Sequence, residues 1–532
     1  MGAPGLALLH PKRLGSTSER VRPVELGLPW TLVLVTVILL GSGLRLANLE
    51  AKPYWFNEVF TSLNISGYDE HRDVNPALYT GALLGTDDLL RYQRLRPDSS
   101  VLDVIQTLRR KDVKWPPGYP VLARSWSRVW GTSVLVMRRL PALVSLLAFP
   151  ALYWLSRELF ESRSVAWMAT ALHAASPMFL AQAQEARPWS LWVAIMVAAT
   201  AILLWALRTR AAKAWWLYAA CASASLYVNA LSLLVIGVHG IHVLLRSRGR
   251  WEEPCRRWSL STLTALASFA PWAACIAWNY QNAVATSNHL RTWPGLHVLA
   301  AGWAEDLRRV FLVPPAGPGA PVLFVAVLAL VCYSFWVLWR DAPLRTSTLV
   351  TILTAAALVV VLVPDLVFHT QVSSRARYMF SSYLGVQLSV AHLLIARMTG
   401  DGARTVAWRG LALALLAAGL ATCVAAVRAD TWWDASREDV VAGRILAGAR
   451  RPLIVTEVHY GVIAPLAHQV KPDAHFILFG RKTPVALPAW DGEVFVYRPS
   501  TDLAQSLAPY GVLRPACAEA DRNCLLHRLH AR

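Results

Sequence analysis

Apolar residues along this chain gather in long runs that are separated by short polar loops. A helix needs about 20 mostly apolar residues to cross the ~30 Å hydrocarbon core of a bilayer, and nine runs approach or exceed that length. They predict a bundle of transmembrane helices, and the longest run is expected to form two short helices around Asn229. The runs are 29–46, 140–155, 188–207, 215–245, 259–278, 322–339, 347–363, 379–395 and 411–427.

Two weaker apolar segments, 118–130 and 165–180, bring the expected number of membrane helices to about 11 to 13. The charges of the loops before Trp115 and after Gln182 assign consistent sides of the membrane only if the chain crosses the membrane one more or one fewer time between these residues. We therefore expect one of the two segments to be short, re-entrant or split.

Two polar regions flank the membrane core. Residues 50–114 form a loop of about 65 residues, which is too long for a simple connection. Within it, 87–92 and 101–111 predict short amphipathic helices on the membrane surface. The tail after residue 428 is too polar for a further span and alternates strand-like with helix-like stretches. These stretches are 452–457, 462–468, 475–479, 493–497 and 502–507.

The predicted fold class is therefore an all-α polytopic membrane protein with a small C-terminal α/β domain. We expect a cytoplasmic N-terminal segment at 1–28, a transmembrane domain at 29–428 that includes the loop 50–114, and a soluble exoplasmic domain at 429–532. Composition agrees, because 55% of the residues are hydrophobic and only 16% are charged. One or two soluble cores cannot bury that many apolar side chains.

The net charge of +19 does not indicate binding to nucleic acid, because the basic residues are spread over short loops. Arginine and lysine in short loops mark the cytoplasmic side of a membrane. The longer polar segments then face the exoplasm, and we expect a multi-pass protein of the bacterial inner membrane. The basic loops lie at 208–213, 246–257, 340–345 and 397–409, and the longer segments at 50–114, 280–320 and 365–378.

Cysteine and metal-ligand patterns add little. Five of the seven cysteines fall in apolar runs or a basic loop, where cysteine packs as a small apolar side chain. Cys517 and Cys524 can pair in an exoplasmic tail, where a disulfide survives. His173, His239 and His242 are expected to be packed or hydrogen-bonded within helices. No metal-binding or P-loop motif is present, so we expect neither a metal nor a cofactor.

Two carboxylates are candidates for a general base. Glu58 stands just after the first apolar run, and a charge so close to a membrane span is disfavoured unless it has a function. Asp112 precedes by three residues a Trp115-Pro-Pro turn that brings the chain back to the same cavity. The alternatives are an interfacial carboxylate without a catalytic role for Glu58, and a solvated loop residue for Asp112.

Arg187 is the first candidate for binding an anionic substrate. A guanidinium group can hold a phosphate through two parallel hydrogen bonds, and Gln184 and Glu185 stand beside Arg187 in the sequence. A salt bridge between Arg187 and Glu185, or an arginine that snorkels to the membrane surface, is the alternative.

Further cations lie on the expected outer side. Arg375 and Arg377, followed by Tyr378, run against the positive-inside pattern, and an anionic lipid or a pyrophosphate would explain them. Plain anchoring to lipid headgroups would also explain them. Lys114 is another candidate phosphate cation, with an ordinary loop lysine as the favoured alternative.

Four motifs follow one another along the chain. They are Trp55-Phe-Asn-Glu58, Trp115-Pro-Pro-Gly-Tyr119, Ser176-Pro with Gln184-Glu-Ala-Arg187, and Ala376-Arg-Tyr378. In this order they resemble the bacterial C-type glycosyltransferases of a family 39-like group, which include protein O-mannosyltransferases and lipid A aminoarabinose transferases. The resemblance covers roughly residues 30–430. It implies a multi-spanning, inverting enzyme that takes a sugar from a polyprenyl-phosphate donor to a lipid, glycan or protein acceptor on the exoplasmic side.

The chain departs from the resembled family at two positions. The family's base is the Asp of an Asp-Glu pair, and here Asn57 stands in its place. An amide cannot take up a proton at neutral pH, so Glu58 or another loop carboxylate is the base, or the chain is weakly active or inactive. Trp115 stands where many relatives have His before Pro-Pro, and with Trp55 and Trp189 it lies beside the expected cavity.

These observations leave three hypotheses for the function of the protein. The leading hypothesis is a glycosyltransferase that uses a polyprenyl-phosphate sugar. The second is a non-catalytic relative that binds or passes lipid-linked sugars, which Asn57 motivates. A secondary transporter fits less well, because no inverted repeat is visible and the long loop and soluble tail have no role in it.

Overall fold

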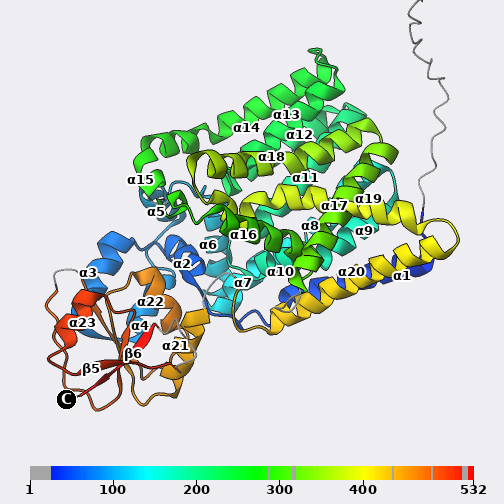
Figure 1. The fold of residues 1–532 in the computed structure, drawn as a ribbon. Coiled ribbons are helices and arrows are strands. Elements are labelled where there is room, and N and C mark those ends of the chain that lie inside the picture. Colours follow the sequence, from blue (N-terminus) through cyan, green and yellow to red (C-terminus); the bar gives the residue numbers. More distant parts are fainter. Residues whose placement is uncertain are drawn as a thin grey trace, which may run out of the picture.

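The structure is a computed structural model that describes residues 25–285, 288–313, 319–433, 437–480, 483–517 and 525–531. Figure 1 shows a bundle of long helices with a small domain of strands and helices at one end. Most of the N-terminal segment expected at 1–28 lies outside the described residues. Cys517 is disulfide-bonded. Its expected partner, Cys524, lies outside the described residues.

Eight helical segments of the described chain are long and apolar enough to cross a membrane. That is fewer than the about 11 to 13 expected, because several apolar stretches fold as shorter helices. α11 and α19 lie at the centre of the bundle with most of their residues buried. The segments are α1 (Leu28–Leu46), α7 with α8 (Val134–Ser145 and Ala148–Phe160), α11 (Trp189–Thr209), α14 (Glu253–Trp278), α17 (Ala320–Asp341), α18 (Leu344–Phe368), the short turn η5 with α19 (Ala376–Met379 and Phe380–Met398) and α20 (Ala403–Arg428).

The two irregular regions of the membrane core fold as shorter helices. The run around Asn229 forms α12 and α13, as predicted. The weak segment 165–180 is split into α9 and α10 at Pro177, because proline has no N–H to extend the preceding helix and is suited to the first turn of a new one. The other weak segment is the single helix α6. The bounds are α6 (Gly118–Trp130), α9 (Arg163–Ala174), α10 (Pro177–Gln184), α12 (Ala212–Val228) and α13 (Ser232–Arg246).

The long loop after α1 is largely helical. Both helices predicted in it are present as α4 and α5, but they pack on different partners. α4 contacts the small domain, where the Tyr460 hydroxyl donates to the Leu89 carbonyl at 2.9 Å, whereas Val104 and Leu108 of α5 pack against α12 and α14. The elements are α2 (Phe56–Ser66), η1 (Glu70–Val74), α3 (Asn75–Leu78), α4 (Thr86–Leu90) and α5 (Val101–Lys111); α15 (Tyr280–Ala285) and α16 (Leu296–Arg309) follow α14.

The small domain contains a six-stranded sheet in the order β1-β3-β2-β4-β6-β5. β2, β3 and β4 are parallel neighbours, and every residue of β2 is buried, as is usual for a central parallel strand. The predicted strands and helices of the tail are all present. They are β2 (Leu453–Thr456), α22 (Tyr460–Ala467), β3 (His475–Phe479), β4 (Val494–Tyr497) and α23 (Thr501–Leu507), with α21 (Arg437–Gly448), β5 (Val512–Pro515) and β6 (Leu526–His530) in addition.

One strand of this sheet comes from the long loop. β1 (Thr80–Gly85) pairs antiparallel with β3, so that Gly85 lies opposite His475. Helix α22 of the small domain also packs on α2, and Phe476 of β3 belongs to the same buried cluster as Val59 and Leu63 of α2. The loop that carries Asn57 and Asp112 is therefore held against the tail, although the two are far apart in the sequence.

Candidate active site

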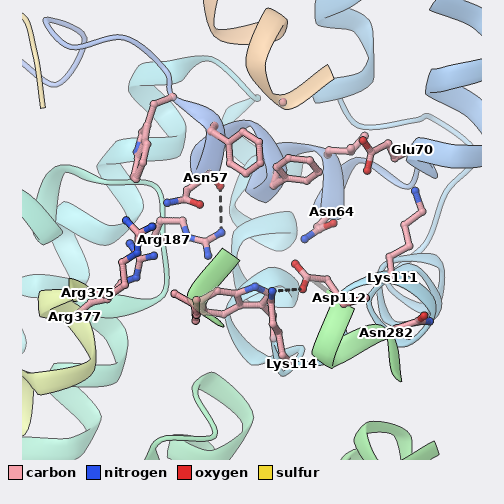
Figure 2. A pocket seen from close by; sticks show the side chains of 18 of the residues that line it. Asn57, Asn64, Glu70, Lys111, Asp112, Lys114, Arg187, Asn282, Arg375 and Arg377 are labelled. Carbon is pink, nitrogen blue, oxygen red and sulfur yellow. Dashed lines mark hydrogen bonds and ion pairs between the residues drawn. The ribbon is translucent and has the colours of Figure 1, made fainter. Parts of the chain in front are cut away.

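A cavity of about 1310 Å³ lies where the small domain meets the end of the helix bundle. Its walls come from α2, the loop before α6, the first residues of α11, the turn η5 and α22. In Figure 2 polar side chains from these elements point into one space. Eight of the eleven predicted site residues line it, namely Asn57, Asp112, Lys114, Trp115, Arg187, Arg375, Arg377 and Tyr378.

Arg187 is positioned by the backbone around Asn57. Its Nη1 donates to the Asn57 carbonyl and to the Thr61 hydroxyl, both at 3.1 Å. Its guanidinium carbon lies 4.4 Å from the centre of the Trp115 ring, a cation–π contact. Among the described residues it forms no ion pair with Glu185 within 4 Å, so the salt-bridge alternative is not supported.

Three arginines lie together on one wall of the cavity in Figure 2. Burial lowers the pKa of the Arg187 guanidinium, and the positive charge of Arg377 lowers it further against the opposing effect of Glu185. Arg377 lies over the rings of Trp189 and Tyr378, 5.4 and 5.7 Å from their centres. The Nε atoms of Arg187 and Arg377 are buried and have no hydrogen-bond partner in the described chain. Such a concentration of cations is suited to an anion.

Asp112 lies on the opposite side of the cavity, at the end of α5 (Figure 2). Its side chain is 22% exposed, and its Oδ1 lies 3.6 Å from the Lys114 ammonium nitrogen. Burial raises the pKa of the Asp112 carboxyl, an effect that the charges of Lys114 and Arg187 only partly offset. The solvated-loop alternative is not supported, because the residue faces the cavity.

Glu58 does not line the cavity. Its carboxylate is fully buried and accepts two hydrogen bonds from Arg138, at 2.8 and 2.6 Å. It also accepts from the backbone N–H groups of Ala186 at 2.9 Å and Trp55 at 3.3 Å. A carboxylate so fully engaged cannot reach a substrate hydroxyl, so the expectation that Glu58 acts as the base is not supported by its position.

Gln184 and Glu185 also lie outside the main cavity. The Gln184 amide donates to the carbonyls of Leu44 and Ala47, at 3.0 and 2.9 Å, and so fixes the end of α1. Glu185 lines a separate cavity of about 80 Å³ that shares Arg375 and Arg377 with the main one. Both are therefore neighbours of the predicted anion-binding wall.

Several cavity residues were not predicted. Glu70 and Lys111 come from the long loop, and Asp439, His459 and Arg498 from the small domain. The His459 ring pairs with the Glu70 carboxylate; burial would raise the pKa of Glu70, but this hydrogen bond and charge lower it overall. The tail residues reach the cavity because the small domain is held against the long loop, by the pairing of β1 with β3 and by the packing of α22 on α2. No local pattern indicates these contacts.

Within the described residues no group of three or more histidine, cysteine, aspartate or glutamate side chains is placed to hold a metal ion. Reaction without a metal remains a prediction from the sequence.

Solved structures similar to this chain include ArnT from Cupriavidus metallidurans bound to undecaprenyl phosphate. The TM-score is 0.53 at 13% identity, over 95% of this chain and 98% of that one. For ArnT in the apo state it is 0.50 at 13% identity, over 94% and 97% of the two chains. The Archaeoglobus fulgidus oligosaccharyltransferase has a TM-score of 0.48 at 12% identity over 86% of this chain, which spans only 65% of that enzyme's length.

No family sequence model and no curated protein sequence matches the chain. The likeness to ArnT runs over nearly the whole of both chains, so it includes the helix bundle, the long loop and the small domain. The protein is therefore an integral, multi-pass membrane protein that has the C-type glycosyltransferase fold its motifs predicted.

Proposed function

We propose that this protein is a glycosyltransferase that moves a sugar from a polyprenyl-phosphate carrier to a lipid, glycan or protein acceptor at the exoplasmic face of the bacterial inner membrane. The observation that carries the proposal is the arrangement in the large cavity, where Arg187, Arg375 and Arg377 face Asp112. ArnT, which shares the fold, binds undecaprenyl phosphate, and this supports the choice of donor.

The proposed reaction is a direct displacement at the anomeric carbon. The acceptor hydroxyl gives its proton to Asp112 as its oxygen bonds to that carbon, and the bond from the carbon to the phosphate oxygen breaks. The electron pair leaves with the phosphate, whose charge Arg187 and Arg377 stabilise. A base and cations on opposite walls suit attack from the face opposite the leaving group, which inverts the configuration.

The cavity has room for both substrates. Small-molecule pockets usually measure about 300–1,000 Å³, and this one measures about 1310 Å³. The small domain closes one side with His459 and Arg498. We assign that side to the acceptor, because Arg187 and Arg377 lie just before α11 and α19, two membrane helices beside which a lipid carrier would enter.

The function is tested by comparing the glycolipids and glycoproteins of cells with and without the gene by mass spectrometry. A sugar modification should disappear on deletion and return with the wild-type gene but not with the Asp112→Asn gene. Deletion without any change in envelope glycans, in cells shown to produce the protein, would contradict the proposal.

Replacing Arg377 by glutamine is expected to raise the KM for the donor by about 10- to 100-fold, since hydrogen bonds to charged groups contribute about 1.5–3 kcal/mol. The measurement is initial-rate kinetics in proteoliposomes with a polyprenyl-phosphate sugar. Arg404→Gln is the matched control, because that exposed arginine does not line the cavity. An equal change in both variants would show a general charge effect rather than donor binding.

The rate of transfer is expected to rise with pH through the pKa of Asp112. Because burial raises that pKa, the acidic limb of kcat/KM should lie at higher pH than the ~3.9 of a free aspartate. Lys114→Gln removes a cation that stabilises the carboxylate, so the limb should move to still higher pH. If the acidic limb does not move in this variant, the group that titrates is not Asp112.

A non-catalytic relative remains the second candidate, because Asn57 lines the cavity at the position where the resembled family has its basic aspartate. Such a protein would bind the lipid-linked sugar without transferring it. If the wild type transfers no sugar and Asn57→Asp does, this candidate is the right one.

A further inference from the structure

A second cavity, of about 520 Å³, lies at the other end of the helix bundle. Trp189, at the N-terminal end of α11, lines the main cavity, whereas Arg208, near the C-terminal end of the same helix, lines the second cavity. About 20 residues of helix span ~30 Å, the thickness of the hydrocarbon core. The two cavities therefore lie at opposite faces of the membrane, and the basic loops place the second one at the cytoplasmic face.

Positive charge exceeds negative charge in this second cavity. Arg208 is paired with Glu158 through hydrogen bonds of 2.9 and 2.7 Å, and Arg345 donates to Glu161 at 2.8 Å. These two carboxylates offset only two of the four arginines. The charged residues that line the cavity are Arg157, Glu158, Glu161, Arg208, Arg246 and Arg345.

His242 supplies a second, independent observation. Its side chain lines the cavity and only 2% of the residue is exposed, yet neither ring nitrogen has a hydrogen-bond partner within the described chain. His239, one turn earlier, bonds to Thr200 and Tyr218, both at 3.0 Å, and His173 bonds to Gln387 at 3.1 Å. All three histidines are packed within helices, as expected, but His242 differs from the other two because it has no hydrogen-bond partner in the described chain.

A buried polar group without a partner is unfavourable, and a ligand oxygen at this place would satisfy the His242 ring. Arg246 and Arg345 lie at the ends of α13 and α18 that meet here. Basic pockets between membrane helices at the cytoplasmic side are suited to lipid headgroups, and the volume is within the ~300–1,000 Å³ of small-molecule sites.

We propose that this cavity binds a phosphate group at the cytoplasmic face, held by Arg246, Arg345 and His242. The phosphate belongs either to the headgroup of an anionic phospholipid or to a small soluble compound. The site is separate from the sugar-transfer cavity, and its existence does not depend on the proposed reaction.

The full-length protein in phosphatidylcholine nanodiscs tests the proposal with two probes. Inorganic phosphate is titrated and its binding followed by phosphorus NMR, and retention of added phosphatidylglycerol is followed by native mass spectrometry. Arg246→Gln with Arg345→Gln should weaken binding of the recognised probe by about tenfold or more. His242→Leu, which changes no arginine, should weaken it severalfold.

Arg250→Gln is the matched control, because this exposed arginine lies in the same basic loop and not in the cavity. Loss of phosphate binding in the cavity variants alone identifies a soluble ligand, and loss of phosphatidylglycerol retention alone identifies a lipid headgroup. The proposal is overturned if neither probe binds the wild type, or if the control loses as much affinity as the cavity variants. Thermal unfolding in the same nanodiscs confirms that each variant is folded.

Discussion

Asp112→Asn is expected to lower kcat for sugar transfer by about 10²- to 10⁴-fold, the usual contribution of a general base. Asparagine has nearly the same shape but cannot take up the proton of the acceptor hydroxyl. Asp112 Oδ1 lies 3.6 Å from the Lys114 ammonium nitrogen, and the amide oxygen of asparagine can keep that contact, so the substitution should leave the fold intact. Donor binding should also remain, because Arg187 and Arg377 are on the other wall. Single-turnover kinetics with a saturating donor measures the chemical step directly.

Glu70→Gln is the informative comparison, because Glu70 lines the same cavity. Its carboxylate is already paired with His459, and the lowered pKa makes it the weaker base. We expect its kcat to fall much less than that of Asp112→Asn. If Glu70→Gln abolishes transfer and Asp112→Asn does not, Glu70 and not Asp112 is the base.

The helix bundle and the arginine wall of the cavity were accessible from sequence because both depend on local patterns. Run length predicts a span, and Asn229 predicts the break between α12 and α13. One of the two weak segments is expected to be short, re-entrant or split, and the structure places a split at Pro177. Arg377 stands out because a cation at the outer end of a span departs from the usual charge distribution. Arg187 stands out because a guanidinium group can hold a phosphate through two parallel hydrogen bonds. Each of these signals lies within a few residues of the feature it predicts.

The part that β1 plays in the sheet and the role of Glu58 were not accessible, because they depend on contacts between distant segments. β1 is a short stretch with two glycines, which have low strand propensity, and only its pairing with β3 makes it a strand. Glu58 looks catalytic because it is a charge beside a span. Its partner Arg138 is 80 positions away, inside an apolar segment where the sequence shows no reason for the pair.

This pair joins three parts of the protein that build the cavity. Arg138 on α7 donates to the carbonyls of Leu49, Lys52 and Pro53 at 2.7 to 2.8 Å, in addition to Glu58. Those carbonyls belong to the chain between α1 and α2, and Ala186, which donates to Glu58, directly precedes Arg187. The buried ion pair therefore helps to place Asn57 and Arg187 in the cavity, together with the hydrogen bonds between these two segments.

Glu58→Gln is expected to destabilise the protein by about 3–5 kcal/mol, because it leaves the Arg138 charge buried without its counter-charge. Arg94→Gln is the matched control. It breaks an ion pair with Asp87 in which the two side chains are 57% and 76% exposed, and pairs of that kind contribute at most about 1 kcal/mol. Chemical denaturation in detergent measures both. Equal stability of the two variants would show that the buried pair contributes no more than a surface pair.

The same variant separates a structural from a catalytic role for Glu58. If Glu58 only holds the loop, its replacement lowers the amount of folded protein, and the folded fraction keeps most of its kcat. The Glu58→Gln, Arg138→Met double variant should then lose less stability than the two single variants added together, since no unpaired charge remains buried. If the Glu58→Gln protein is as stable as the wild type but cannot transfer sugar, Glu58 and not Asp112 is the base.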